Sequence, residues 1–327
     1  MASDVWLETA PTANRHDAIK GQDDPDHNEL RANLRKEVPS FTVRVTINSK
    51  CCIIHALPSA MAENCSFCGF YLPPHLRYCP SCERDAGYPN VRAAGADDEA
   101  IALRARFQEA EEDAERRNCL LQLQRFGAAV AGSKAIICRS LQGALSFVSS
   151  DNALYNTFYQ QVESGARIPE ANFWDRARVP VDGTLFPMYQ EKIVFGMLSL
   201  DNQGSSYHGP YVIVLKESMV GHRASVFEEN SVNFFQKRSD IRVGGAAPAG
   251  YRTIWAMRDK LAVAKCHSRI GSATISNDFP AILLVPGADP KDNDFIEVHI
   301  YGPIHRHAIA GPTHINVHSL LYAEKRK

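Results

Sequence analysis

The chain has 327 residues and a formal net charge of −1, with 45% hydrophobic and 22% charged residues. This composition is typical of a globular protein of one or two domains, and it excludes collagen-like, coiled-coil and wholly disordered chains. Since no global charge favours a nucleic acid or an anionic membrane, a polyanion would need a local basic patch. No apolar run approaches the ~20 residues of a membrane span, and residues 1–40 lack the pattern of a secretory signal. We therefore expect a cytoplasmic protein, in its own or a host cell.

Nine cysteines are present, and four of them form two C-x-x-C units. Paired and stray thiols together indicate metal binding in a reducing compartment rather than a disulfide framework. Each C-x-x-C presents two thiolates from a tight turn, and four sulfur ligands favour Zn²⁺ over Mg²⁺ or Ca²⁺. The spacing resembles a short zinc ribbon and predicts a structural zinc ion; an iron–sulfur or redox role is the alternative. The predicted ligands are Cys65, Cys68, Cys79 and Cys82.

Several large apolar residues surround these cysteines. We expect them to form the small core of the zinc module; the alternative is that some are exposed and contact a protein partner. They are Phe67, Phe70, Tyr71, Leu72 and Tyr78.

The remaining chain divides by composition. Residues 1–38 are polar and predict a flexible segment, and residues 39–92 hold an alternating strand at 41–47 followed by the zinc module. Residues 93–127 predict one long linking helix with a solvent-exposed charged middle and a docked C-terminal end. Residues 128–327 carry short apolar runs at 134–138, 192–200, 211–215, 281–285 and 295–301, with helices expected at 151–164 and 255–265. This pattern predicts a mixed α+β domain.

The usual catalytic signatures are missing from this domain. The sequence has no phosphate-binding GxxxxGK[ST], no GxGxxG, no GxSxG and no HExxH, which disfavours common nucleotide-binding enzymes and hydrolases. What remains is a set of polar residues in strand-like runs. Arg139 ends the first run and Ser199 ends the second, while Glu297 and His299 share one face of the last because strand side chains alternate.

The order FGMLSL, GPYVIVLKESM, RASVFEENS and FIEVHIYGPI resembles bacterial ADP-ribosyltransferase-like toxin and effector families. The resemblance implies a split β-sheet that holds NAD as co-substrate in an extended form. It places Arg139 at the first-strand position, where forked donors suit a pyrophosphate or carboxamide, and Ser199 beside it in the cofactor site. Glu297 takes the position of the catalytic glutamate, which stabilises an oxocarbenium-like cation. His299 would help to position the acceptor.

We therefore expect an NAD-dependent ADP-ribosyltransferase-like enzyme whose zinc ribbon recognises a protein partner or substrate. A non-catalytic, zinc-dependent interaction protein is the alternative, and the charge balance disfavours a nucleic-acid-binding module. Three local alternatives stay open: Glu228-Glu229 as the catalytic acids, a cysteine nucleophile such as Cys266, and a second metal at His305-x-His307, for which no third ligand is evident.

Overall fold

The computed structural model describes residues 63–150, 152–169, 172–238, 246–287 and 289–310. All of these residues belong to one compact unit, 57–327. The predicted flexible segment 1–38, the strand at 41–47, Cys51, Cys52 and the histidines beyond 310 lie outside the described residues.

Short apolar segments, well separated in the chain, form one antiparallel sheet with the order β5-β3-β4-β8-β6-β7. Four of these strands were predicted, because long apolar runs bounded by Gly, Pro and Asp favour buried strands. The strands are β3 (Lys134–Arg139), β4 (Ile193–Ser199), β5 (Tyr211–Val214), β6 (Ala224–Phe227), β7 (Arg252–Ile254) and β8 (Glu297–Tyr301).

Helices occupy much of the rest of the described chain, so the α+β class predicted from the sequence is confirmed. They are α2 (Pro89–Ala94), α3 (Asp97–Arg116), α4 (Leu120–Ala131), α5 (Leu141–Val148), α6 (Phe158–Glu163), α7 (Phe173–Leu185), α8 (Glu217–Val220), α9 (Ser231–Lys237), α10 (Arg258–Cys266) and α11 (Phe279–Leu283). None of the helices within the described ranges combines the length and the apolar character needed to cross a membrane.

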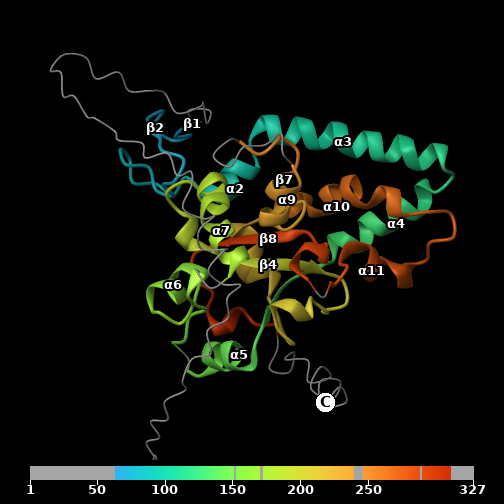
Figure 1. Ribbon diagram of the computed structural model, residues 1–327. Coiled ribbons are helices and arrows are strands. Elements are labelled where there is room, and N and C mark those ends of the chain that lie inside the picture. Colours follow the sequence, from blue (N-terminus) through green and yellow to red (C-terminus); the bar gives the residue numbers. More distant parts are fainter. Residues whose placement is uncertain (1–62, 151, 170–171, 239–245, 288, 311–327) are drawn as a thin grey trace, which may run out of the picture. The chain divides into compact units, whose positions relative to one another are not determined.

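One face of the sheet is covered by α10, which packs against both α3 and α4 (Figure 1). Alternation along the strands directs Ile137, Leu198 and Ile300 to this side, where they join the largest core cluster. The helices contribute Phe126 and Leu261, which are fully buried there. This apolar cluster holds the central strands against α3, α4 and α10.

The opposite face is covered by α7 and α9, which also contact each other. Ile193, Phe227 and Tyr301 point to this side and pack with Leu185 and Phe234. Glu297 and His299 share this face, because they alternate with Val298 and Ile300 along β8. Two polar side chains thus lie under α7 and α9 in an otherwise apolar layer.

The segment expected as one linking helix forms two. Asn118 takes a left-handed conformation (φ 56°) between α3 and α4, and asparagine tolerates that region better than most residues. The middle of α3 is also not solvent-bridging, since Leu103, Ala110 and Ala114 are buried against the core. The buried residues recur at helical spacing but are few, and most of the residues between them are charged. The sequence pattern therefore did not indicate a buried face.

The run 281–285, expected as a strand, belongs mainly to α11 (Phe279–Leu283). Pro280 lies in its first turn, where a proline is favourable because its missing N–H would have no partner. A short apolar run does not by itself distinguish a buried strand from a buried helix.

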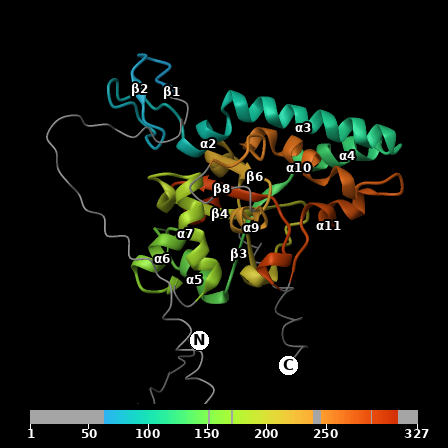
Figure 2. The same ribbon diagram turned by 45° about the horizontal axis from the view of Figure 1, so that its top comes forward.

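The sheet is split between β3 and β4 (Figure 2). Only the first half of β3 pairs with the end of β4, from Lys134 opposite Ser199 to Ile136 opposite Met197. Beyond Ile136, β3 stays paired with β5, and the first half of β4 stays paired with β8. The end of β3 at Arg139 and the start of β4 at Ile193 are therefore not paired with each other, and the two strands diverge there.

Candidate functional site

A cavity of about 110 Å³ opens where β3 and β4 diverge. Arg139 lines it from the end of β3 and Glu297 lines it from β8, so the fold brings these two predicted residues to one site. The cavity also has aromatic walls, which suit a flat or partly apolar ligand. These are Tyr155, Phe158, Trp174, Phe195, Tyr207 and Phe295.

The Glu297 carboxylate is buried but has several hydrogen-bond donors. The backbone N–H of Ser231 donates to Oε2 at 3.0 Å, and the Asn230 amide donates to Oε1 at 3.3 Å. Burial by itself would raise the pKa of Glu297, but the hydrogen bond from His299 and the charge of Arg178 outweigh it, so the pKa is lowered. The structure holds a carboxylate in its ionised form at the wall of a cavity.

His299 lies behind Glu297 rather than at the wall of the cavity. Its Nε2 is 3.0 Å from Glu297 Oε2, and since an ionised carboxylate only accepts, Nε2 carries the proton. The rings of Phe186, Phe195 and Phe227 surround the imidazole, with centroids 4.8, 5.4 and 6.0 Å away. His299 is therefore placed to orient Glu297, whereas the sequence suggested a role towards the acceptor.

Arg139 has a different environment. Its guanidinium lies 4.7 Å from the centroid of the Tyr155 ring, and within the described residues it makes no ion pair or hydrogen bond. Burial, together with the nearby charges of Arg167 and Arg178, lowers the pKa of Arg139 to about 10. A cation in this position can still accept an anionic partner.

Two more arginines line the cavity and were not identified from the sequence. Arg167 forms a two-point ion pair with Asp175, with N–O distances of 2.5 and 2.6 Å. Arg178 comes from α7 and lies 3.7 Å from Asp182, four residues further along the helix. Two sequence signals could have identified this helix: Asn172 as its N-cap, and the four-residue spacing between Arg178 and Asp182. Pro180 obscures both, because a proline argues against a continuous helix.

Asp182 is fully buried behind Arg178, and the Tyr159 hydroxyl donates to its Oδ2 at 3.0 Å. Burial raises the pKa of Asp182 to about 7, and the negative charge of Glu297 adds to this while Arg178 opposes it. Of these two carboxyl groups, Glu297 thus has a lowered pKa and Asp182 has a pKa close to neutral pH.

Ser199, predicted to join the cofactor site, lies at the other end of β4 from the cavity and does not line it. Its hydroxyl is 2.8 Å from the carbonyl oxygen of Gln203 and 3.1 Å from Asp201 Oδ1. Asp201 also accepts from the backbone N–H of Gln203. Ser199 therefore stabilises the turn that follows β4.

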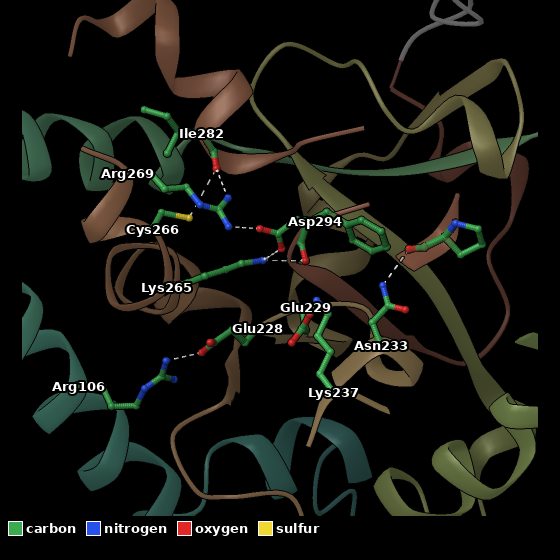
Figure 3. Close-up of polar contacts among 12 residues, drawn as sticks. Arg106, Glu228, Glu229, Asn233, Lys237, Lys265, Cys266, Arg269, Ile282 and Asp294 are labelled. Carbon is green, nitrogen blue, oxygen red and sulfur yellow. Dashed lines mark hydrogen bonds and ion pairs between the residues drawn. The ribbon is translucent and has the colours of Figure 1, made fainter. Parts of the chain in front are cut away.

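Both glutamates of the acidic pair Glu228-Glu229 form ion pairs (Figure 3). Glu228 is 2.5 Å from Arg106, and Glu229 is 2.7 Å from Lys237. Neither glutamate lines the cavity. The structure therefore favours Glu297 over this pair as the acid of the site.

Two of the stray thiols that the structure describes, Cys266 and Cys138, do not have the environment of a nucleophile. Cys266 is fully buried, and burial raises its pKa to about 11. Cys138 lines the cavity, but burial raises its pKa to about 11 as well. A reactive cysteine needs a lowered pKa, so the cysteine alternative loses support at both positions.

The four predicted metal ligands converge: their sulfur atoms all lie within 4.8 Å of one another. The Sγ atoms of Cys65 and Cys82 are 3.7 Å apart, and those of Cys68 and Cys79 are 3.6 Å apart. Tetrahedral coordination with ~2.3 Å Zn–S bonds separates the sulfurs by ~3.8 Å. The cluster can hold a metal ion, and its dimensions fit zinc.

Both C-x-x-C turns have the same backbone geometry. The N–H of Gly69 donates to the carbonyl of Cys65, and that of Glu83 donates to the carbonyl of Cys79. Gly69 (φ 72°) and Glu83 (φ 59°) are both left-handed. The backbone N–H of Cys82 helps to lower the pKa of the Cys79 thiol, while hydrogen bonds from the neighbouring thiols raise the pKa of Cys82.

The aromatic residues of this module were expected to form its core, and the structure corrects this for four of the five. Only Leu72 is buried, together with Cys65 and Cys79, and the partly buried Leu76 and Cys82 pack against them. The aromatic side chains are about half exposed. They are Phe67 (54%), Phe70 (49%), Tyr71 (50%) and Tyr78 (53%).

His305 and His307 stack with parallel rings, with centroids 5.5 Å apart. No group of three or more potential ligands includes them within the described residues, where the cysteine cluster is the group found. The structure gives no support to a second metal at these histidines.

Comparison with known protein families finds no family model that matches the chain, and a search of curated proteins finds no match to it. The candidate functions therefore depend on the cavity and on the cysteine cluster.

Proposed function

We propose that the protein is an ADP-ribosyltransferase-like enzyme that cleaves NAD and transfers ADP-ribose to a macromolecular nucleophile. The observation that carries the proposal is that Arg139 and Glu297, from opposite ends of the domain's sequence, line one cavity. The split between β3 and β4 supports it as well, because the resemblance implies such a sheet.

In this reaction the bond between ribose C1′ and the nicotinamide nitrogen breaks, and its electron pair neutralises the positive nitrogen. The cationic ribose then forms a bond with the acceptor nucleophile, which loses a proton. Glu297 would stabilise the cation through its ionised carboxylate. His299, Ser231 and Asn230 would keep that carboxylate oriented and charged.

We further propose that the four-cysteine module binds a structural Zn²⁺ and recognises the target. Four protein sulfurs would complete the coordination of zinc, leaving no position for a substrate. The distances of 3.6 and 3.7 Å between paired sulfurs support a tetrahedral site. Zinc would then stabilise the two turns, while the chemistry would lie in the cavity.

The enzymatic proposal is tested by nicotinamide release from NAD by the purified protein. Glu297→Gln should reduce the rate by at least about 100-fold, because it removes the charge that stabilises the cation. Glu229→Gln is the matched control, since Glu229 pairs with Lys237 away from the cavity, and it should keep nearly full activity. Equal rates for wild type and Glu297→Gln would contradict the assigned role.

A second candidate function is a metal-dependent protein-interaction module without catalysis. The exposed aromatic rings beside the cysteine cluster favour it, because aromatic residues are enriched at protein interfaces. This function predicts no NAD binding by calorimetry and a bound protein partner that is lost in Cys65→Ser. NAD cleavage by the purified protein would exclude a non-catalytic function and leave partner binding as a secondary role of the cysteine module.

A further inference from the structure

We propose that the protein binds an amphiphilic monocarboxylate, an aliphatic chain that ends in one carboxylate, in an open groove between α4 and α11 (Figure 1). The groove has a volume of about 440 Å³, which lies within the ~300–1,000 Å³ typical of small-molecule sites. None of its residues lines the cavity that holds Glu297. The inference therefore concerns a second site and does not depend on the cleavage of NAD.

The apolar walls of this groove are continuous with the core of the protein. Phe279 is 3% exposed and belongs to the largest core cluster, and Ala129 and Leu200 pack against the same cluster. The Phe279 ring is held by Phe126, with ring centroids 5.5 Å apart. An aliphatic chain in the groove would therefore leave water for a preformed apolar surface. The apolar residues of the walls are Ala128, Ala129, Leu200, Phe279 and Pro280.

The side of the groove formed by α4 consists of small side chains. Ala128 and Ala129 present only methyl groups there. Ala128 is exposed, whereas its helix neighbours Phe126 and Val130 are fully buried. A large side chain at position 128 would therefore fill the groove without entering the core.

One end of the groove carries a cation. Arg125 and Ser276 are the polar residues that line it. Arg125 lies one helical turn before Ala128 and Ala129, so it is on the same side of α4. Within the part of the chain that the structure describes, Arg125 makes no ion pair or hydrogen bond. Its fork of N–H donors matches the two oxygens of a carboxylate.

Among the described residues, no carboxylate lines the groove and competes for Arg125. The acids that adjoin the lining residues in sequence already have partners. Asp278 accepts from the backbone N–H of Ile275 at 2.9 Å, and Asp201 accepts from that of Gln203 at 2.9 Å. One guanidinium beside uncharged walls complements a ligand with a single negative charge and an apolar body.

The size of the groove favours a small molecule over a protein partner. Seven residues line it, whereas a stable protein interface uses ~20–30 residues on each side. Arg125 is exposed, and an exposed ion pair contributes little to binding. The aliphatic chain should therefore supply most of the affinity, and Arg125 the preference for an anion.

The test measures octanoate, butyrate and octanol binding to the full chain by calorimetry. Octanoate should bind at least about tenfold more tightly than butyrate, because its longer chain buries more apolar surface. It should bind at least about threefold more tightly than octanol, which has the same chain but no charge. Arg125→Gln should weaken octanoate at least about threefold and change octanol less than about twofold. Ala128→Trp should weaken both ligands at least about tenfold.

Two matched variants control for indirect effects. Gln124→Trp adds the same ring to an exposed position of α4 outside the groove, and Arg104→Gln removes an exposed cation from α3. Both should bind octanoate within about twofold of wild type. Circular dichroism verifies that each variant is folded.

Octanoate binding no tighter than that of butyrate would overturn the inference, as would binding that Arg125→Gln or Ala128→Trp leaves unchanged in a folded protein. Sedimentation of the same variants distinguishes another occupant. A dimer that Ala128→Trp abolishes, without any octanoate binding by the wild type, would assign the groove to a second copy of the chain and contradict the proposal.

Discussion

At the scale of single residues, Glu297 combines two properties that normally oppose each other, full burial and a lowered pKa. Donors from three different residues compensate for the lost hydration: His299, Ser231 and Asn230. Such an arrangement is typical of functional sites. The position of Glu297 at the wall of a cavity is what favours function here.

Of these donors, His299 lowers the pKa of Glu297 the most, so its replacement is the clearest test. Its replacement in His299→Phe removes the hydrogen bond and the positive potential, so the pKa of Glu297 should rise. Because the ionised form of Glu297 acts in the proposed reaction, nicotinamide release should then be lost at a higher pH as the solution is acidified. The shift is measured from the pH dependence of nicotinamide release by the wild type and His299→Phe. His222→Phe is the control, because His222 does not line the cavity. An unshifted acid limb in His299→Phe would contradict the positioning role.

Asp182 should make stability depend on pH. Its pKa is raised from 3.8 to about 7 by burial, so between about pH 4 and 7 the folded protein binds a proton that the unfolded chain has released. Stability from this group therefore falls as the pH rises through that window. Between pH 5 and 7.5 the Tm of wild type should fall more than that of Asp182→Asn. Parallel Tm curves would show that the carboxyl does not titrate there.

At the scale of elements, the end of β3 depends on Gly209. Gly209 has a φ of 126°, which side chains other than hydrogen rarely allow, and a Cβ there would overlap the Arg139 carbonyl. Gly209→Ala should destabilise the fold by more than about 2 kcal/mol and displace Arg139. Denaturant unfolding measures this. Gly183→Ala in α7, where a Cβ meets nothing within 4 Å, is the control and should be neutral or stabilising by up to ~1 kcal/mol. Equal stabilities for the two variants would contradict the contact.

The strands that carry the predicted site residues could be predicted, whereas the helix behind the site could not. The apolar runs around Arg139, Ser199 and Glu297 gave β3, β4 and β8 because buried central strands have strong patterns. Helix α7 has Pro180 and Gly183 within it, so local propensity argues against it. Tertiary packing against the sheet decides its structure, and Arg178 and Asp182 were therefore missed.

The resemblance suggested Arg139 and Glu297 in one site but could not exclude Ser199. All three lie on strands of one sheet, and only the register shows that Ser199 is at the closed end of the split. Register depends on long-range pairing that a single sequence does not encode locally.

At the scale of the whole described unit, α2 joins the cysteine module to the sheet. Arg92 donates to the carbonyl oxygens of Leu76 and Gly87 at 2.8 and 2.7 Å. Asn90, on the same helix, donates to the carbonyl of His299 at 3.0 Å and to Ser225 Oγ at 3.1 Å. These contacts link the metal turns to the strand that carries Glu297, so loss of the metal should also weaken the site.

Metal analysis tests this dependence. The purified protein should contain one equivalent of zinc, and Cys65→Ser should lose most of it, because a ligand set with three sulfurs binds more weakly. Cys266→Ala removes a buried cysteine outside the cluster and should retain the zinc. The rate of nicotinamide release should fall severalfold in Cys65→Ser alone. Full zinc content in Cys65→Ser would exclude this cluster as the metal site.

The most direct measurement of the central claim is a crystal structure of the Glu297→Gln variant with NAD. Because the substitution slows cleavage, intact NAD should be retained and visible. The account predicts NAD in the cavity between β3 and β4, in contact with Arg139 and with its nicotinamide ribose against residue 297. NAD bound elsewhere on the protein, or no binding at saturating concentration, would contradict it.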